Sequence, residues 1–320
     1  MWYVADMPEL PEVETVVRGL RAEVCGRRFV AVRLGKTDFM DDPAAIQREL
    51  PGRQIERVER YGKFLVMRLG PANGAGSAAS LLLHLCMTGQ ISPRRPEETA
   101  PLHTHAYLSL DDGRELRYTD VRRFGRMAFL AEGQLEAELG RLGLDPFETG
   151  REKFCAHLSG RQAMIKALLL DQHTLRGLGN IYADESLWRA RIHPRRQAAR
   201  LSREQLARLH AALQHVLKAA IKLRGSSISD FVDAEGRPGE YQQRHRAYGR
   251  EGKDCYRCGS KIRRVIVAGR SSYFCPRCQR EPAAWACSAG RKRGAAAAKM
   301  SSPQTRRSRR SSQRTRSRKQ

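Results

Sequence analysis

Two Cys-x2-Cys pairs near the end of the chain constrain its fold more than any other feature. The first pair is Cys255 and Cys258, the second is Cys275 and Cys278, and 16 residues separate the pairs. Each pair can present two thiolates from one tight turn, so two pairs complete a tetrahedral zinc site with no open position. The spacing therefore predicts one structural Zn²⁺, and a redox-active pair of dithiols is the alternative.

The residues between the two pairs have the pattern of a β-hairpin. Segments 262–267 and 272–274 are rich in β-branched and aromatic side chains, and Arg263, Arg264 and Arg270 make the hairpin basic. So short a hairpin buries too little apolar surface to fold alone, and we expect the metal to supply its folding free energy. A basic hairpin held by zinc is suited to contact with nucleic acid.

The charge of the whole chain also indicates a polyanionic partner. Lys and Arg total 59 against 34 Asp and Glu, which gives a net charge of +25. Residues 281–320 hold 12 of the basic residues and one acid, so residues 1–280 keep 47 basic against 33 acidic residues, or +14. Because the remainder is still basic, nucleic acid is favoured over an ordinary enzyme with a charged tail. The tail is mostly Ala, Ser, Arg and Lys and is predicted to be disordered.

Neither a membrane span nor a secretory signal is visible in the sequence. The longest apolar stretch, 81–87, is too short to cross a bilayer and contains His84. The first 14 residues lack a basic segment followed by an apolar core. We therefore expect a cytoplasmic protein with no membrane partner, whose paired cysteines bind metal instead of forming disulfides.

The order of predicted elements is one helix, then strands, then helices, which gives an α+β fold class. The first helix covers 8–24 and ends at Gly26. Short strands with short connections then predict a β-sandwich, with 70–80 as a flexible loop. The predicted strands are 28–34, 54–59, 64–69, 81–85, 107–110, 115–118 and 127–130.

The second half of the chain is predicted to be helical up to residue 223. Candidate helices cover 161–170 and 181–190, and Ser202 with Gln205 forms a capping box that starts a longer helix. Residues 224–253 are rich in Gly, Ser and Arg, so this segment is expected to contribute few core residues and to become ordered on binding.

Six motifs precede the cysteine pairs. On these motifs and the cysteine pairs, the chain resembles one known family. The match to the formamidopyrimidine-DNA glycosylase (Fpg/Nei) family covers about residues 7–280. The motifs are PELPEVET at 8–15, YGK at 61–63, HLCMTG at 84–89, TDVRRFG at 119–125, GLGNIYADE at 177–185 and SSISDF at 226–231.

The resemblance implies an N-terminal helix plus β-sandwich, then a helical helix–two-turn–helix domain with a C-terminal zinc-finger hairpin. It divides the chain into a catalytic β-sandwich domain at 8–140, a helix–two-turn–helix DNA-binding domain at 150–248 and a zinc finger at 249–280. The basic tail at 281–320 and an extra segment at 1–7 lie outside these domains, and the extra segment is expected to be absent from the active protein.

The activity that the resemblance implies belongs to base excision repair. A DNA-formamidopyrimidine glycosylase would remove 8-oxoguanine and formamidopyrimidines, and a DNA-(apurinic or apyrimidinic site) lyase would cut the abasic strand by β,δ-elimination. Pro8 would attack as a secondary amine and form a Schiff base, and Glu9 would be the general acid on the sugar ring oxygen. Lys63 would support elimination near the sugar-phosphate, and Arg270 would assist the second elimination.

The position of Pro8 inside the chain conflicts with that role. An internal proline nitrogen is a tertiary amide, which has no nucleophilic lone pair. Because Met7 stands directly before Pro8, we expect translation to start at Met7 or residues 1–7 to be removed. The resulting N-terminal amine would have a pKa of about 8. If the N-terminus stays blocked, a zinc-dependent DNA-binding protein without catalysis is the alternative.

The implied partner is double-stranded DNA that contains oxidised purines or abasic sites, bound by a monomer associated with the nucleoid. The target base must leave the duplex, and Met87, Arg122 and Phe124 would fill the gap. Val121 stands where the family usually has proline. The turn from Gly177 to Asn180 precedes a helix, so its backbone N–H groups could approach a phosphate. The residues that match the family's other DNA contacts are His103, Arg161 and Asn180.

Within the family, an endonuclease VIII-like enzyme that acts on oxidised pyrimidines is the alternative. The chain reads PELPEV at its start and not the PEGPEI usual in that group. Residues 224–248 resemble the loop that caps purine lesions. Both features favour the enzyme for oxidised purines.

Overall fold

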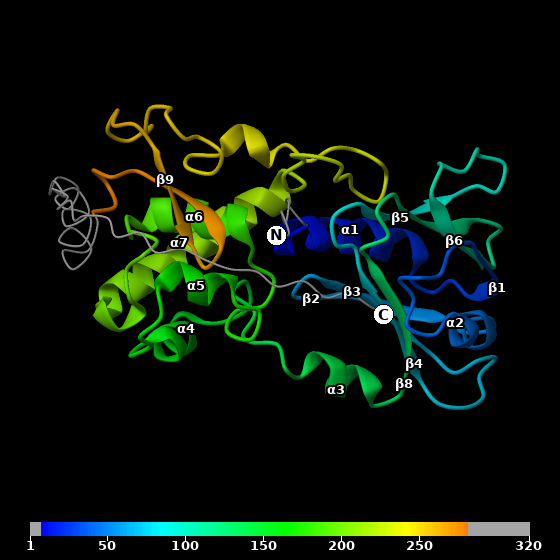
Figure 1. Ribbon diagram of the computed structural model, residues 1–320. Coiled ribbons are helices and arrows are strands. Elements are labelled where there is room, and N and C mark those ends of the chain that lie inside the picture. Colours follow the sequence, from blue (N-terminus) through cyan, green and yellow to red (C-terminus); the bar gives the residue numbers. More distant parts are fainter. Residues whose placement is uncertain (1–7, 281–320) are drawn as a thin grey trace, which may run out of the picture. The chain divides into compact units, whose positions relative to one another are not determined.

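The computed structural model describes residues 8–280, so the predicted segments at 1–7 and 281–320 lie outside the described residues. The first element is helix α1, Leu10–Val24, as the spacing of its apolar residues predicts (Figure 1). At its start the Glu12 side chain accepts a 2.9 Å hydrogen bond from the backbone N–H of Glu9. Gly26 follows the helix with a φ of +84°, a conformation that glycine adopts without strain.

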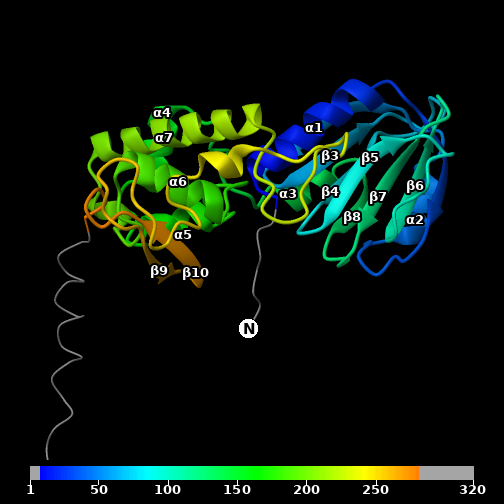
Figure 2. The same cartoon turned by 90° about the horizontal axis from the view of Figure 1, so that it is seen from above.

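Two antiparallel four-stranded sheets form the first half of the molecule (Figure 2). One has the strand order β2-β3-β4-β8, the other has the order β1-β6-β7-β5, and α1 packs against strands of both sheets. Their inward side chains form one buried apolar cluster with α1, so the predicted β-sandwich is confirmed. The strands are β1 Phe29–Leu34, β2 Ile55–Tyr61, β3 Phe64–Leu69, β4 Ala79–His84, β5 Gly89–Arg94, β6 Thr104–Leu110, β7 Glu115–Asp120 and β8 Arg126–Ala131.

The second half is helical and has its own apolar cluster. Its longest helix starts at the predicted capping box, because the Ser202 side chain accepts a 3.2 Å hydrogen bond from the backbone N–H of Gln205. The helices are α2 Pro43–Glu49 and α3 Gln134–Leu139 beside the sheets, followed by α4 Arg151–Leu158, α5 Ile165–Leu170, α6 Asn180–Ala190, α7 Arg203–Lys222 and the 3₁₀ turns η1 Ala198–Arg200 and η2 Tyr241–Arg244.

A two-stranded hairpin lies between the two cysteine pairs, as predicted. Strand β9, Arg263–Val267, pairs antiparallel with β10, Arg270–Phe274. The hairpin shares a small buried cluster with Trp188 of α6. Among residues 8–280, no helix is long and apolar enough to cross a membrane. The fold class is therefore α+β, with the predicted order of sandwich, helical domain and finger.

One predicted helix boundary was wrong, and one strand of the sandwich was not predicted. The helix predicted from residue 161 begins at Ile165, because residues 161–163 instead accept backbone hydrogen bonds from residues 198 and 199. Strand β5 was not predicted; it contains Pro93, which is tolerated because β5 is an edge strand. Segment 224–253 contributes few core residues, as predicted, and three of them, Phe231, Tyr241 and Ala247, lie in three different apolar clusters.

Candidate active site and DNA-contact residues

The Glu9 carboxylate is bound by the amino end of helix α6. Backbone N–H groups of Gly179 and Ile181 donate hydrogen bonds of 2.8 and 2.9 Å to it, and Tyr182 donates a longer one of 3.3 Å. The side chain is buried, and burial raises the pKa of Glu9 to about 7 against the opposing effects of Lys63 and these N–H groups. A buried carboxyl group that titrates near neutrality can hold and release a proton under physiological conditions.

This arrangement corrects one expectation from the sequence. The backbone N–H groups of the Gly177–Asn180 turn were expected to face a phosphate, but Gly179 donates to Glu9 and Gly177 donates to the Gln172 side chain. The anion at this helix start is thus supplied by the protein itself. Asn180 stays a predicted contact through its side-chain NH2 group, which can donate to a phosphate; its buried Oδ1 atom, which has no hydrogen-bond partner within residues 8–280, can only accept.

A second buried carboxylate, Glu12, lies beside Glu9. Its oxygens accept hydrogen bonds from the backbone N–H of Ser226 (2.7 Å), from the Tyr182 hydroxyl and from the backbone N–H of Glu9. Burial, reinforced by the charge of Glu9, raises the pKa of Glu12 to about 8. The pair therefore stores a proton next to Pro8, which directly precedes Glu9.

Pro8 lines a small hollow under the SSISDF segment. The other lining residues include Glu12, Ile181 and Phe231, which come from three different parts of the chain. Phe231 and Pro8 are both buried. The geometry brings the predicted nucleophile, the acidic pair and the predicted capping segment together in one place.

Lys63 lies in the same electrostatic environment as Glu9. It occupies the two-residue turn between β2 and β3, where Gly62 has a φ of +62° and lies close to Arg176. Burial lowers the pKa of Lys63, while the nearby Glu9 and Glu12 carboxylates oppose that shift and the Arg270 guanidinium adds to it. Glu9, Glu12, Lys63 and Arg270 therefore form one interacting group of charges.

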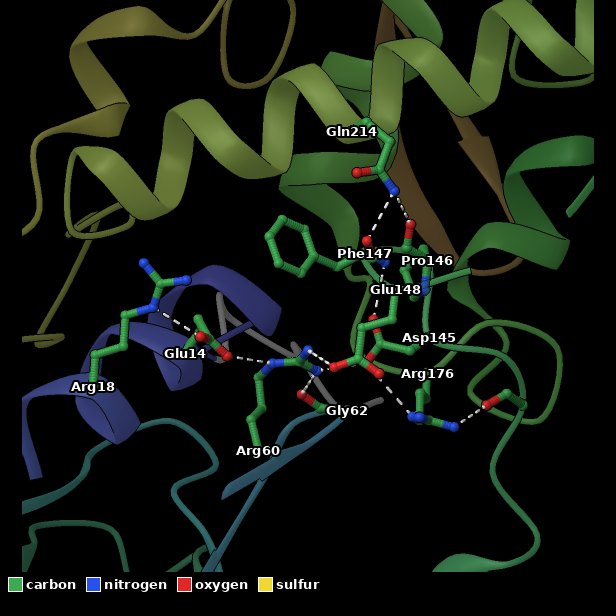
Figure 3. Close-up of polar contacts among 11 residues, drawn as sticks. Glu14, Arg18, Arg60, Gly62, Asp145, Pro146, Phe147, Glu148, Arg176 and Gln214 are labelled. Atoms are coloured by element: carbon green, nitrogen blue, oxygen red, sulfur yellow. Dashed lines mark hydrogen bonds and ion pairs between the residues drawn. The ribbon is translucent and has the colours of Figure 1, made fainter. Parts of the chain in front are cut away.

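A buried ion-pair network fixes the turn that carries Lys63 (Figure 3). Arg60 at the end of β2 binds Glu14 of α1 at 3.0 Å and Asp145 at 2.7 Å, and Arg60 is almost fully buried. Asp145 also lies 3.6 Å from Arg176, and the Gln214 side chain of α7 donates to the backbone carbonyls of residues 146 and 147. The network joins the sandwich, the 145–148 connection and the helical domain, and Arg60 also donates at 3.3 Å to the carbonyl of Gly62, the residue before Lys63.

Arg270 is positioned by a buried ion pair beneath the hairpin. Lys166 of α5 and Asp184 of α6 are fully buried and lie 2.6 Å apart. The Lys166 ammonium donates to the backbone carbonyl of Ser271 at 2.9 Å, and the Asp184 carboxylate accepts from the backbone N–H of Tyr273 at 2.8 Å. Both contacts hold β10 directly after Arg270, which is how a residue of the finger reaches the group of charges around Glu9.

The four predicted metal ligands come together. The sulfur atoms of the cysteines at 255, 258, 275 and 278 all lie within 4.8 Å of one another. The Trp188 indole N–H donates to the Cys255 sulfur at 3.4 Å, a contact that orients one ligand. Four thiols in a compact group fit a tetrahedral zinc ion and leave no position open for a substrate, so this is one structural zinc site.

The predicted gap-filling residues fall into two groups. Arg122 and Phe124 are exposed on the segment after β7, and the Arg122 guanidinium lies 4.8 Å from the centre of the Phe124 ring. Met87 is buried, with 8% of its surface exposed. The Thr88 hydroxyl joins them, because it donates to Asp120 and accepts from the backbone N–H of Arg122.

The remaining predicted contacts are exposed on separate loops. His103 has a φ of +71° and its carbonyl accepts a hydrogen bond from the backbone N–H of Asp120. Arg161 follows α4 and donates to the carbonyl of His157 at 3.0 Å. Their exposure leaves both side chains accessible to a phosphate.

Several site residues were not identified from the sequence. Glu12, Tyr182, Lys166 and Asp184 are not singled out by the sequence, which only places them within predicted helices. The available signal was that charged residues occupy core-facing positions of helices, which is costly unless each charge has a partner.

Comparison with known protein families gives three successive matches along the chain, and they agree with the family that the sequence motifs resemble. Residues 7–127 match the formamidopyrimidine-DNA glycosylase N-terminal domain, residues 142–232 match the formamidopyrimidine-DNA glycosylase H2TH domain, and residues 252–280 match a zinc finger found in FPG and IleRS. A formamidopyrimidine-DNA glycosylase of Herpetosiphon aurantiacus is 43% identical over 278 residues, which cover 85% of this chain and 100% of the relative.

Two solved structures of the Lactococcus lactis Fpg are also similar. One is a complex with DNA that contains an abasic site; it is 33% identical, with a TM-score of 0.77, and the match covers 85% of this chain and 100% of that one. The other is a complex with DNA that contains an oxidised pyrimidine; it is 32% identical, with a TM-score of 0.76, and the match covers 86% of this chain and 100% of that one.

Proposed function

The chain belongs to the formamidopyrimidine-DNA glycosylase family, and from that premise we propose that it is a bifunctional DNA glycosylase and AP lyase. It excises 8-oxoguanine and formamidopyrimidines from double-stranded DNA and then cuts the abasic strand. The observation that carries this proposal is the Glu9 carboxyl group, which directly follows Pro8 and is buried with a pKa of about 7.

The chemistry requires Pro8 as a free secondary amine. Its nitrogen attacks C1′ of the deoxyribose, the glycosidic bond breaks, and the amine proton neutralises the departing base. The C1′–O4′ bond then opens to give an iminium ion, and Glu9 donates a proton to O4′. A carboxyl group with a pKa near 7 is protonated often enough at neutral pH to do this.

Strand cleavage follows from the iminium ion. Loss of a proton from C2′ breaks the C3′–O bond and releases the 3′ phosphate, and loss of a proton from C4′ then breaks the C5′–O bond and releases the 5′ phosphate. We assign Lys63 to the first elimination and Arg270 to the second, and their shared electrostatic environment with Glu9 supports both assignments. The zinc site contributes no step; its four cysteines hold the hairpin that carries Arg270.

DNA binding divides between gap filling and phosphate contact. We assign Met87, Arg122 and Phe124 to the space that the extruded base leaves, as the exposure of Arg122 and Phe124 supports. His103, Arg161 and Asn180 are assigned to phosphates, so binding should weaken steeply as the salt concentration rises.

The same proposal sets the organisation of the chain and its setting. The catalytic sandwich covers 8–140, the DNA-binding helical domain covers 150–248 and the finger covers 249–280. The active protein begins at Pro8, acts as a monomer in the cytoplasm and associates with the nucleoid through DNA. The family match that begins at residue 7 supports this start.

Borohydride trapping on abasic duplex DNA tests the central step. Protein that begins at Pro8 should form a covalent adduct, and a Pro8→Gly variant or a protein with residues 1–7 still attached should trap far less. Intact-mass measurement of the trapped protein identifies its first residue. Full activity from a chain whose mass begins at Met1 would overturn the assignment of Pro8, and tight lesion binding without trapping would favour a DNA-binding protein without catalysis.

Oxidised pyrimidines are a second candidate substrate class. The similar Lactococcus lactis Fpg is described in complex with DNA that contains one. Parallel excision assays on 8-oxoguanine:cytosine and thymine-glycol duplexes compare the two classes, and we expect faster excision of 8-oxoguanine. Faster excision of thymine glycol would instead show that oxidised pyrimidines are the preferred substrates.

A further inference from the structure

A hollow of about 380 Å³ between α6, α7 and the 241–246 segment is lined by several positively charged side chains. It is separate from the Pro8 hollow, and the two have no lining residue in common. Most of its cationic side chains are exposed to solvent. The basic residues that line it are Arg189, His215, Lys222, Arg244 and Arg246.

The charge of the hollow is not balanced by nearby acids. Glu185 is the one acidic residue of its lining, and the Glu185 carboxylate accepts four hydrogen bonds from the backbone N–H groups of residues 246–248. Burial raises the pKa of Glu185 to about 7, so its negative charge is only partial near neutral pH. Across residues 8–280, no ion pair links a carboxylate to Arg189, Lys222 or Arg244, whereas arginines such as Arg126 bind acids directly.

Concentrated like charge disfavours the compact state unless a counter-charge binds. The effect is visible at His215, whose pKa is lowered by burial and by the Arg189 guanidinium. An anion that enters the hollow would offset this repulsion. Because several cations surround one space, an anion with several negative groups would interact with more of them than a single ion could.

The aromatic residues of the hollow decide which part of such an anion is recognised. The Trp188 ring is buried and is covered by the Arg257 guanidinium at 4.2 Å from its centre, and Tyr241 is buried too. With 8% and 5% of their surface exposed, Trp188 and Tyr241 offer little ring area on which a nucleobase could stack. We propose that this hollow binds a chain of phosphate groups, at a second site that acts independently of the catalytic one.

Two sources share this chemistry, a stretch of DNA backbone away from the lesion and a free polyphosphate. The proposal goes beyond the proposed function and does not depend on it. The test uses the full-length, zinc-loaded protein and inorganic tripolyphosphate at constant ionic strength. Isothermal titration gives the affinity, and the imidazole NMR signals of His215, assigned with a His215→Gln variant, show whether the ligand enters this hollow.

A double variant and a charge-matched control make the test specific. Lys222→Ala/Arg244→Ala removes two cations from the hollow, and Arg48→Ala/Arg57→Ala removes two exposed cations that bind acids elsewhere. We expect the hollow variant to lose about tenfold or more in tripolyphosphate affinity, while the control variant keeps it. Equal weakening in both variants, or no movement of the His215 signals, would overturn the proposal.

Binding to undamaged duplex DNA then distinguishes the two sources. If DNA phosphates occupy the hollow, the hollow variant should lower the slope of log affinity against log salt by about two, and the control variant should not. If the slope is unchanged while tripolyphosphate affinity falls, the ligand is a free polyphosphate. The catalytic proposal is checked separately by borohydride trapping, so the two can fail independently.

Discussion

The Glu9 carboxylate accepts a 2.8 Å hydrogen bond from the backbone N–H of Gly179, which lies 170 positions later in the chain. This contact places the Glu9 carboxylate, the proposed general acid, against Gly179, which caps the start of helix α6. It depends on the absence of a side chain at residue 179, because a Cβ atom there would lie 2.4 Å from the Glu9 Cδ atom.

Gly179→Ala should therefore displace the Glu9 carboxylate without unfolding the protein. A displacement of about 1 Å at a catalytic group can cost about 100-fold in rate, and we expect a loss of that order in single-turnover excision. Gly150→Ala is the matched control, since a Cβ atom at Gly150 meets no atom within 4 Å. Similar rates for the two variants would show that the position of Glu9 does not limit the reaction.

The rate of borohydride trapping should have a bell-shaped dependence on pH. Burial raises the pKa of Glu9 to about 7, so its protonated form is present below that pH and is lost as the pH rises through it. The Pro8 amine has the opposite requirement, since it must be neutral and its pKa is about 8. We expect a maximum between about pH 7 and pH 8.

Glu9→Gln separates the two limbs of this profile. The variant cannot donate the proton to O4′, so we expect trapping to slow by about 100-fold. Its remaining rate should follow the amine alone and rise steadily with pH. A variant that kept the alkaline decrease of the original profile would contradict the assignment of that limb to Glu9.

The sequence predicted the elements with strong local signals and missed the contacts between distant elements. The α1 helix, the strands and the zinc hairpin follow from periodicity and from ligand spacing, which act over a few residues. Glu9 and Lys63, which come from separate motifs, lie close enough for each charge to shift the pKa of the other, and their roles stay a prediction. The hydrogen bonds from the N-terminal end of α6 to the Glu9 carboxylate could not be predicted. The local sequence of a helix start does not show whether a side chain of the same protein or an external anion binds there.

Lys166→Met should destabilise the protein strongly. It would leave the fully buried Asp184 without its 2.6 Å partner and remove the hydrogen bond to the Ser271 carbonyl. Loss of one partner from a buried ion pair costs about 3–5 kcal/mol of unfolding free energy. Urea unfolding of the zinc-loaded protein measures this cost, and Lys166→Met/Asp184→Leu should recover part of it.

The same variants test whether the pair positions Arg270. Both should yield less of the second elimination product relative to the first, because β10 is no longer held directly after Arg270. Arg48→Ala removes an exposed ion pair and should change stability by less than about 1 kcal/mol, with an unchanged product ratio. An unchanged ratio in Lys166→Met would mean that the pair stabilises the fold only.

Phe124→Ala should slow excision from duplex DNA and spare the reaction on a single strand. Phe124 is 47% exposed beside Arg122, and its removal would leave part of the gap in the duplex unfilled. Stacking of an aromatic side chain is worth about 1–3 kcal/mol per base, so a loss of about tenfold is expected. Trapping on a single-stranded abasic oligonucleotide is the control, because no gap forms there. Equal losses on both substrates would place Phe124 in the catalytic site instead.

Removal of zinc should unfold the finger, while the sandwich and the helical domain, each with its own apolar cluster, stay folded. The finger shares only a small cluster with Trp188, whose indole donates to the Cys255 sulfur, so the metal supplies most of the folding free energy of residues 255–278. In a Trp285→Phe variant of the protein that begins at Pro8, Trp188 is the one tryptophan left. Its fluorescence should change on chelation and recover when zinc is added back, while the helical circular dichroism persists. The second elimination product should be lost with the metal, because Arg270 leaves the site, while the first elimination, assigned to Lys63, should persist. Cys258→Ser should behave like the metal-free protein, and Cys155→Ser, a buried cysteine of the helical cluster, should still bind one zinc ion. If the metal-free protein kept both the Trp188 signal and the second elimination product, the finger would be folded and functional without zinc, and the position of Arg270 would depend on the Lys166–Asp184 pair alone.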